Sequence, residues 1–282
     1  MDWMDSLNRA LRYIEAHLTD EGLSVEAVAR ASAYSPFYLQ RLFYVLTDAT
    51  LADYIRGRRL SAAGQALQGG AKVLDTALRY GYETPESFTK AFRRFHGVSP
   101  SAAQRTQAQL KYLSPLTIKV ELTGGSIMDY TVESMGEMKI VGKVRRFGMD
   151  EAFGLIPGFW DEYHKQGLDK TVCGYLGVCF DETASDFAYL IGAFAKEGAP
   201  VPEGFEAHTI APHTWVKFRA VGPIPTAIQK VNRQIYTEWL PGNLEYELAD
   251  GVNIEMYSEG DGAAADYVAE IWLPVRRKTE AK

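Results

Sequence analysis

An internal repeat is the feature that most constrains the fold of this 282-residue chain. Ala29 and Tyr34 recur 48 residues later as Ala77 and Tyr82. After a one-residue insertion the offset is 49, and two apolar sets correspond, each with the i, i+3, i+4, i+7 spacing of one helix face. These sets are Leu39, Leu42, Phe43 and Leu46, and Phe88, Ala91, Phe92 and Phe95. The sequence therefore predicts one small helical unit that occurs twice, with these residues in its cores.

Residues 5–110 are expected to be almost entirely helical, because apolar residues recur at helical spacing after capping residues. Ser24, Ser35 and Thr84 precede three of these runs. Proline follows Ser35 and Thr84, as is favoured at the first helical position. Helices are expected near residues 6–18, 25–31, 37–46, 51–67, 73–80 and 86–96.

The remaining residues mix strand and helix patterns. Strands are expected at 130–134, 138–146, 174–180, 187–194, 205–210, 214–221, 252–257 and 267–275, and helices at 156–166 and 225–240. Asp186-Phe187-Ala188 is echoed by Asp266-Tyr267-Val268, which places Leu190 and Glu270 at matching positions. We therefore predict an α+β domain with a duplicated (ββαββ)2 layout behind the all-α domain.

The predicted domains are residues 1–112 and 128–282, with a linker at 113–127. Residues 111–123 could include a short strand, and Gly124-Gly125-Ser126 indicates a joint. Lys and Arg outnumber Asp and Glu by 14 to 11 in the first domain, whereas acidic residues outnumber basic ones by 25 to 16 in the rest. This asymmetry suggests two different tasks, the basic one compatible with nucleic acid.

Several functional classes lack their sequence signals. The cysteines, Cys173 and Cys179, lie too far apart along an expected strand to pair, which fits a reducing cytoplasm. There is no secretory signal and no apolar run of membrane-spanning length. The five histidines show no zinc spacing, and no nucleophile, Walker or dinucleotide motif is present. We therefore expect no metal, no cofactor, no catalytic residues and no membrane contact.

The repeated unit suits DNA recognition. A reading helix needs an apolar face that anchors it and a polar face that carries donors for base edges in the major groove. Two such units joined by one long helix could place their recognition helices in successive major grooves, about 34 Å apart. Since both lie on one chain, a monomer could bind double-stranded DNA.

Residues 23–105 resemble the DNA-binding domain of the AraC/XylS family. The resemblance rests on Leu39-Gln40-Arg41-Leu42-Phe43, on Ala77-Leu78-Arg79-Tyr80-Gly81-Tyr82, and above all on Ser87-Phe88-Thr89-Lys90-Ala91-Phe92 and Phe95-His96-Gly97-Val98-Ser99-Pro100. It implies base contacts from Phe37, Gln40 and Arg41 on the first recognition helix, and from Glu86, Thr89 and Lys90 on the second. Lys90 stands where arginine is common, and an ammonium gives less directional readout than a guanidinium. For Arg58 and Arg59, phosphate contact and solvent exposure are equally expected.

A carboxylate among aromatic residues marks the second domain. In the expected strand 267–275, alternation puts Val268, Glu270 and Trp272 on one face. A buried carboxylate is costly unless it is protonated, paired or bound to a cation. Aromatic rings around one acid suit a lipophilic cation. The alternative for Glu270 is an edge-strand residue paired with a neighbouring base.

Residues 128–278 resemble a GyrI-like effector-binding domain through Gly174-Tyr175-Leu176-Gly177-Val178 and Ala269-Glu270-Ile271-Trp272-Leu273-Pro274. Behind an AraC-type domain, this layout resembles the Rob-type regulators. The resemblance implies that a small, cationic or amphipathic compound binds between the two halves. Glu270 is the expected central acid, and Trp160, Tyr175, Tyr257 and Trp272 are candidate lining residues. For each aromatic residue, packing in the core is an equally good interpretation.

The sequence therefore predicts a cytoplasmic transcriptional regulator with DNA, a small-molecule effector and RNA polymerase as partners. Two alternatives remain open. The second domain could be a small-molecule hydrolase with Glu270 as general base, fused to a DNA-binding module. It could also be an inhibitor module that binds a protein.

Overall fold

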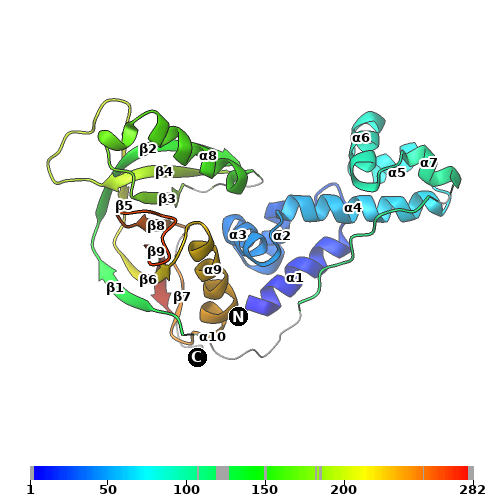
Figure 1. Ribbon diagram of the computed structural model, residues 1–282. Coiled ribbons are helices and arrows are strands. Elements are labelled where there is room, and N and C mark those ends of the chain that lie inside the picture. The colour runs from blue at the N-terminus through cyan, green and yellow to red at the C-terminus, as the bar shows by residue number, and fades with distance from the viewer. Residues whose placement is uncertain are drawn as a thin grey trace. The chain divides into compact units, whose positions relative to one another are not determined.

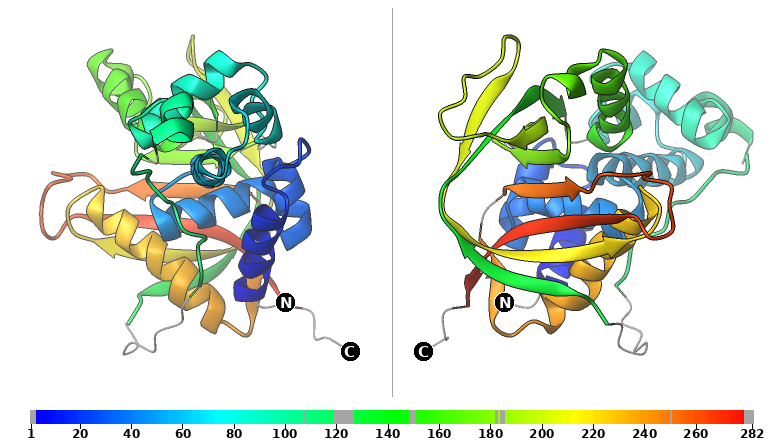
Figure 2. Two further views of the ribbon diagram at one scale, coloured as in Figure 1. Left: turned by 90° about the vertical axis from the view of Figure 1, so that its right-hand side faces the viewer. Right: turned by 60° about the vertical axis from the view of Figure 1, so that its left-hand side comes forward.

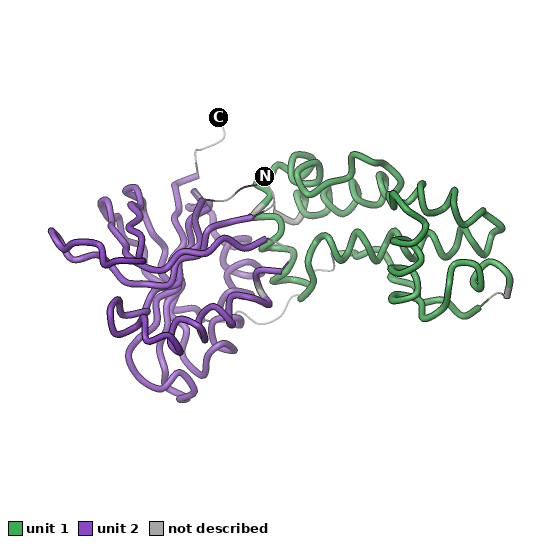
Figure 3. The backbone as a smooth tube through the Cα atoms, turned by 90° about the horizontal axis from the view of Figure 1, so that it is seen from above, with its two compact units in different colours: residues 1–122 green, residues 123–282 purple. Residues whose placement is uncertain are grey.

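Two compact units make up the chain, residues 1–122 and 123–282 (Figure 3). The computed structural model describes residues 3–106, 108–118, 127–148, 151–181, 183, 186–249 and 251–278. Of the predicted linker at 113–127, residues 119–126 lie outside this description, and so does the predicted Gly124-Gly125-Ser126 joint.

Unit 1 is helical throughout its regular elements, as predicted. Its helices are α1 (Trp3–Ala16), α2 (Val25–Ser32), α3 (Pro36–Thr47), α4 (Leu51–Gln68), α5 (Val73–Arg79), α6 (Pro85–His96) and α7 (Pro100–Thr106). The expected caps are in place, because the hydroxyls of Ser24, Ser35 and Thr84 accept backbone N–H groups three residues later. Figure 1 shows α4 running between α1–α3 at one end and α5–α7 at the other.

The repeat forms two separate cores, which α4 joins. Leu39, Leu42 and Phe43 are at most 2% exposed in the first. In the second, Phe88 and Phe92 are fully buried among residues of α4, α5 and α7. The apolar faces predicted from the repeat are therefore confirmed as core.

The extended segment 108–118, here called the strap, lies along α4. The short strand considered for residues 111–123 is absent from the described part of that stretch. The backbone groups of the strap instead bind side chains of α4: Leu113 N–H donates to Ser61 Oγ, and Leu116 N–H donates to the Tyr54 hydroxyl. A strand needs a neighbouring backbone as its partner, and here side chains take that place.

The described residues of unit 2 form one antiparallel sheet and two principal helices. Its strands are β1 (Tyr130–Met135), β2 (Met138–Gly148), β3 (Leu176–Phe180), β4 (Asp186–Phe194), β5 (Glu206–Ile210), β6 (His213–Val221), β7 (Tyr246–Leu248), β8 (Asn253–Tyr257) and β9 (Val268–Arg277). Its helices are α8 (Ala152–Lys165), the short 3-10 helix Leu168–Lys170, and α9 (Thr226–Gln234), which continues as the π-helical Ile235–Trp239 and α10 (Leu240–Gly242).

The duplicated halves of unit 2 are β1–β4 with α8 and β5–β9 with α9. The strand order β1-β6-β9-β8-β3-β4-β2-β5 shows how these halves combine. The first strand of each half pairs across the duplication, since β1 lies beside β6 and β5 beside β2. The halves meet where β3 pairs with β8, with Gly177 opposite Glu255. The duplicated layout is as predicted, apart from the additional β7, which pairs with β9. Each half is thus completed by a strand of the other.

The two faces of the sheet have different neighbours. Helices α8 and α9 lie on the same side, which we call the helix face (Figures 1 and 2). There Phe159 of α8 contacts Phe147, and Trp239 contacts Phe218. On the opposite face, apolar side chains from both halves form one cluster that includes Leu176, Ile254 and Trp272. Phe159, Trp215, Tyr236 and Trp239 are buried and belong to the core.

Candidate DNA-binding and effector-binding sites

The first predicted recognition helix, α3, begins at Pro36 after the Ser35 cap. Helical spacing turns Arg41 away from Leu39 and Phe43 and places Gln40 at the border of that apolar face. Both side chains are buried in the structure, at 5% and 9% exposed. The side chain of Phe37 lies outside the described residues. Contact with bases requires side chains that DNA can reach, so these three contacts stay predictions.

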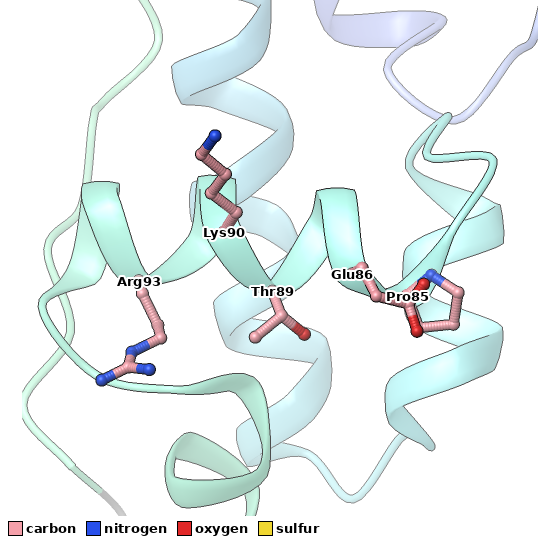
Figure 4. Close-up of a pocket in the computed structure, with 5 residues that line it drawn as sticks. All are labelled: Pro85, Glu86, Thr89, Lys90 and Arg93. Atoms are coloured by element: carbon pink, nitrogen blue, oxygen red, sulfur yellow. The ribbon is translucent and has the colours of Figure 1, made fainter.

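The second predicted recognition helix, α6, presents its polar side chains around a shallow hollow of about 480 Å³. Pro85, Glu86, Thr89, Lys90 and Arg93 line it (Figure 4). Glu86 and Lys90 are exposed and Thr89 is half-buried. Figure 4 shows Lys90 and Arg93 extending to different sides of the helix. The face offers both donors and acceptors to a groove, and its base contacts also stay predictions.

Two arginines that were expected to face phosphate or solvent form hydrogen bonds within unit 1, and only Arg58 is buried there. Arg58 is 6% exposed, and its Nη2 lies 2.7 Å from Glu15 Oε2. Arg59 donates from Nε to the carbonyl of Leu18 and from Nη2 to that of Asp20. Both interpretations were wrong for Arg58, because its guanidinium finds a carboxylate on α1 that is distant in sequence.

Glu270 and Trp272 share the face opposite α8 and α9, since β9 pairs them with Met256 and Ile254 of the cluster on that face. The alternation predicted for this strand is therefore confirmed. Trp272 Nε1 donates to Glu270 Oε2 at 2.7 Å. Lys217 Nζ lies 3.9 Å from the centre of the Trp272 ring. A protein cation thus already occupies the ring that a ligand cation would use.

Tyr175 belongs to this same side of the sheet. Its ring centre lies 6.2 Å from that of Phe194, which lies 6.0 Å from that of Trp272. The Tyr175 hydroxyl accepts a hydrogen bond from the Phe194 N–H at 3.1 Å. Three of the five predicted ligand contacts, Glu270, Trp272 and Tyr175, are therefore grouped together.

Trp160 and Tyr257 are brought together on the helix face. Their ring centres are 5.2 Å apart, in an edge-to-face arrangement. Trp160 Nε1 donates to the Tyr189 hydroxyl at 3.0 Å, and the Tyr257 hydroxyl donates to Glu255 Oε2 at 2.9 Å. Burial, reinforced by the nearby charge of Glu255, holds the pKa of Tyr257 well above its usual value, so this hydroxyl stays a donor.

Gly177 gives this group its space. A Cβ atom there would lie 2.2 Å from the Tyr189 hydroxyl and 3.3 Å from Trp160 Cζ2. Because Gly177 pairs with Glu255 at the junction of the halves, the acid faces a position without a side chain. No Lys, Arg or His among the described residues forms an ion pair with Glu255. We call Trp160, Tyr189, Glu255 and Tyr257 the junction cluster.

Sequence reasoning missed Glu255, because the GyrI-like resemblance points to Glu270 in the last strand. A signal was present: in Asn253-Ile254-Glu255-Met256-Tyr257, polar groups alternate with apolar residues. Alternation places Asn253, Glu255 and Tyr257 on one face. Only the pairing of β8 with β3 shows that this face lies at the junction of the halves.

Within the described ranges, no group of three or more His, Cys, Asp or Glu side chains is placed to hold a metal ion. None of the described helices combines the length and apolarity needed to cross a membrane.

Comparisons with known proteins match both units. The model of the GyrI-like small molecule binding domain matches residues 128–276, more than half of the chain, and a helix-turn-helix domain model matches residues 28–106. The Right origin-binding protein of Escherichia coli K12 is 36% identical over 107 residues, which cover 38% of this chain and 37% of that protein. The regulatory protein SoxS of the same strain is 39% identical over 92 residues, or 32% of this chain and 85% of SoxS.

Among solved structures, SAV2435 bound to tetraphenylphosphonium is 23% identical with a TM-score of 0.48, over 53% of this chain and 94% of that chain. The chain thus spans little more than a third of the Right origin-binding protein and most of SoxS.

Proposed function

The chain belongs to the GyrI-like small-molecule binding family through residues 128–276, behind an AraC-type helix-turn-helix region, and on this premise we propose that it is a transcriptional regulator whose DNA binding changes when a lipophilic aromatic cation binds at the junction cluster. The choice of a cation as the ligand rests on the surroundings of Glu255. This carboxylate lies beside aromatic rings and forms no ion pair with a described side chain.

The chemistry of the junction cluster favours a cation over an anion or a sugar. A half-buried carboxylate gains free energy when a positive charge comes close, and more so where water is partly excluded. Aromatic faces add cation–π attraction. Glu270, the acid expected from the sequence, has Lys217 as a neighbour on its own face. We therefore propose Glu255 as the central acid and keep Glu270 as the alternative.

The DNA side of the proposal uses α3 and α6 together. SoxS, which matches unit 1 along most of its length, is a regulatory protein. Thr89 and Lys90 of α6 are accessible, and the proposal requires that DNA binding uncover Gln40 and Arg41 of α3, which are buried in this structure. The two helix-turn-helix units can then read adjacent parts of one site. We propose RNA polymerase as the partner that senses the outcome, and the cytoplasm as the place of action. The hydrolase and inhibitor alternatives have no observation that favours them.

The proposal is tested by linkage between ligand and DNA. The preferred DNA site of the full chain is selected from random duplexes. Its affinity is then measured with and without tetraphenylphosphonium, and with tetraphenylborate, an anion of the same shape. We expect the cation alone to change the affinity for DNA, and DNA to change the affinity for the cation by the same factor. A cation that binds tightly without changing DNA affinity or transcription would contradict the proposal.

Arg41→Ala is expected to weaken binding to the selected site by about 1–3 kcal/mol, because a guanidinium can form a bidentate contact with guanine. Preference at one base pair should relax. Lys90→Ala should cost less binding free energy, since the hydrogen bonds of an ammonium to bases are less directional than those of a guanidinium. The measurement is a titration of both variants against selected and random duplexes. Equal losses on the two duplexes would show that Arg41 contacts only phosphate.

A further inference from the structure

The strap follows α4 in the reverse direction, from the second helix-turn-helix unit to the first. Gln68 Nε2 at the end of α4 donates to the carbonyl of Ala108 at 2.8 Å. Near the start of α4, the Tyr54 hydroxyl accepts the N–H of Leu116 at 3.0 Å. Between these points, Leu113 N–H donates to Ser61 Oγ at 2.9 Å, and Arg58 donates to the Leu113 carbonyl. The strap therefore spans most of α4, the helix that joins the two helix-turn-helix units.

Two glycines of α4 make room for the strap. A Cβ atom at Gly57 would lie 2.7 Å from Leu113 Cδ2, and one at Gly64 would lie 2.9 Å from Leu110 Cδ1. Glycine within a helix is less favourable than alanine by about 1 kcal/mol. Two glycines in one 18-residue helix weaken it, and the close packing of Leu110 and Leu113 offsets that loss.

The strap and α4 are also tied to α1 through buried polar groups. Arg58 contacts Glu15 through two nitrogens, at 2.7 and 2.8 Å, and its charge lies 5.6 Å from the centre of the Tyr112 ring. The Tyr54 hydroxyl donates to Glu15 at 3.0 Å while it accepts from the strap. Burial raises the pKa of Tyr54 to about 12, so its hydroxyl keeps both roles. A buried arginine with these partners is costly to move.

We propose that the strap is a positioning element for DNA recognition. It braces α4 along its length and thereby fixes the separation and orientation of α3 and α6. Gly57, Ser61 and Leu113 are then positioning residues for a DNA site that both helices contact. This inference rests on the proposed contact of both helices with DNA. Two linked binding modules reinforce each other only when the link holds them at the spacing of their sites.

The test uses the full chain and two duplexes, one with the complete selected site and one with half of that site replaced by random sequence. Leu113→Asp puts a charge against α4 and should expel the strap. Leu116→Asp is the matched control, because the Leu116 side chain is exposed. Gly57→Gln supplies a good helix former that does not fit beneath Leu113, so it displaces the strap without weakening α4.

Leu113→Asp and Gly57→Gln should each lose at least tenfold in affinity for the complete site and less than twofold for the half site, while Leu116→Asp stays within twofold on both. Amide hydrogen exchange reports the strap directly, since the N–H groups of Leu113 and Leu116 are bonded in the intact protein. Both should exchange faster in the two displacing variants.

Equal losses on the two duplexes would overturn the positioning role and show a merely structural one. Fast exchange with unchanged affinity for the complete site would overturn it as well. Unchanged protection in both displacing variants would contradict the packing on which the proposal rests. If the unsubstituted protein binds both duplexes equally, contact of both helices with DNA is refuted, and the role of the strap is refuted with it. This result is seen with the unsubstituted protein alone, so it is distinguishable from a failure of the strap proposal by itself.

Discussion

Glu255→Gln should lower the affinity of the full chain for tetraphenylphosphonium at least 30-fold. At an effective dielectric constant of about 20, a carboxylate about 4–8 Å from a positive charge contributes about 2–4 kcal/mol. Glutamine keeps the shape of the side chain and an acceptor for the Tyr257 hydroxyl, so the loss measures the charge. Isothermal titration calorimetry of the two proteins measures the ratio.

Glu270→Gln is the matched control, since it makes the same chemical change on the opposite face of the sheet. It should leave the affinity for the cation within twofold. Tetraphenylborate should bind the unchanged protein more weakly than the cation, and Glu255→Gln should narrow that difference. If Glu270→Gln causes the loss and Glu255→Gln does not, Glu270 is the central acid that the sequence led us to expect. If both variants bind like the original protein, the junction cluster is not the cation site.

Gly177→Ala should disrupt the junction cluster and reduce cation binding at least tenfold. The added Cβ atom would overlap the Tyr189 hydroxyl and crowd Trp160, so both rings must move. Overpacking of this kind also costs about 1–3 kcal/mol of stability. The measurements are the affinity for tetraphenylphosphonium and the thermal unfolding of the second unit within the full chain.

A double-mutant cycle with Tyr189→Phe separates local crowding from general damage. Removing the hydroxyl relieves the shortest contact, at 2.2 Å, and leaves the 3.0 Å contact with Tyr189 Cζ. The alanine substitution should therefore cost less in the phenylalanine background. Additive effects would show that Gly177 and Tyr189 do not interact as described. DNA affinity without ligand should stay unchanged, because unit 1 carries the recognition helices.

The helical unit could be read from the sequence because local rules decide most of it. Capping hydroxyls at Ser24, Ser35 and Thr84 start helices wherever they occur, and apolar residues at helical spacing select one face. Phe88 and Phe92 are fully buried on that basis. The strap could not be predicted this way. Its extended backbone pairs with side chains about 40–60 positions away, and no local pattern records such partners.

By itself, then, the sequence determined the two kinds of unit, the duplicated strands, and the alternation that puts Glu270 beside Trp272 on one face. Only the tertiary structure decided which acid lies at the junction of the halves. A two-residue period assigns side chains to faces within one strand, but the order of strands in a sheet depends on pairings between distant segments. The pairing of β3 with β8 puts Glu255 opposite Gly177 and beside Trp160, whereas Glu270 lies on the other face near Lys217.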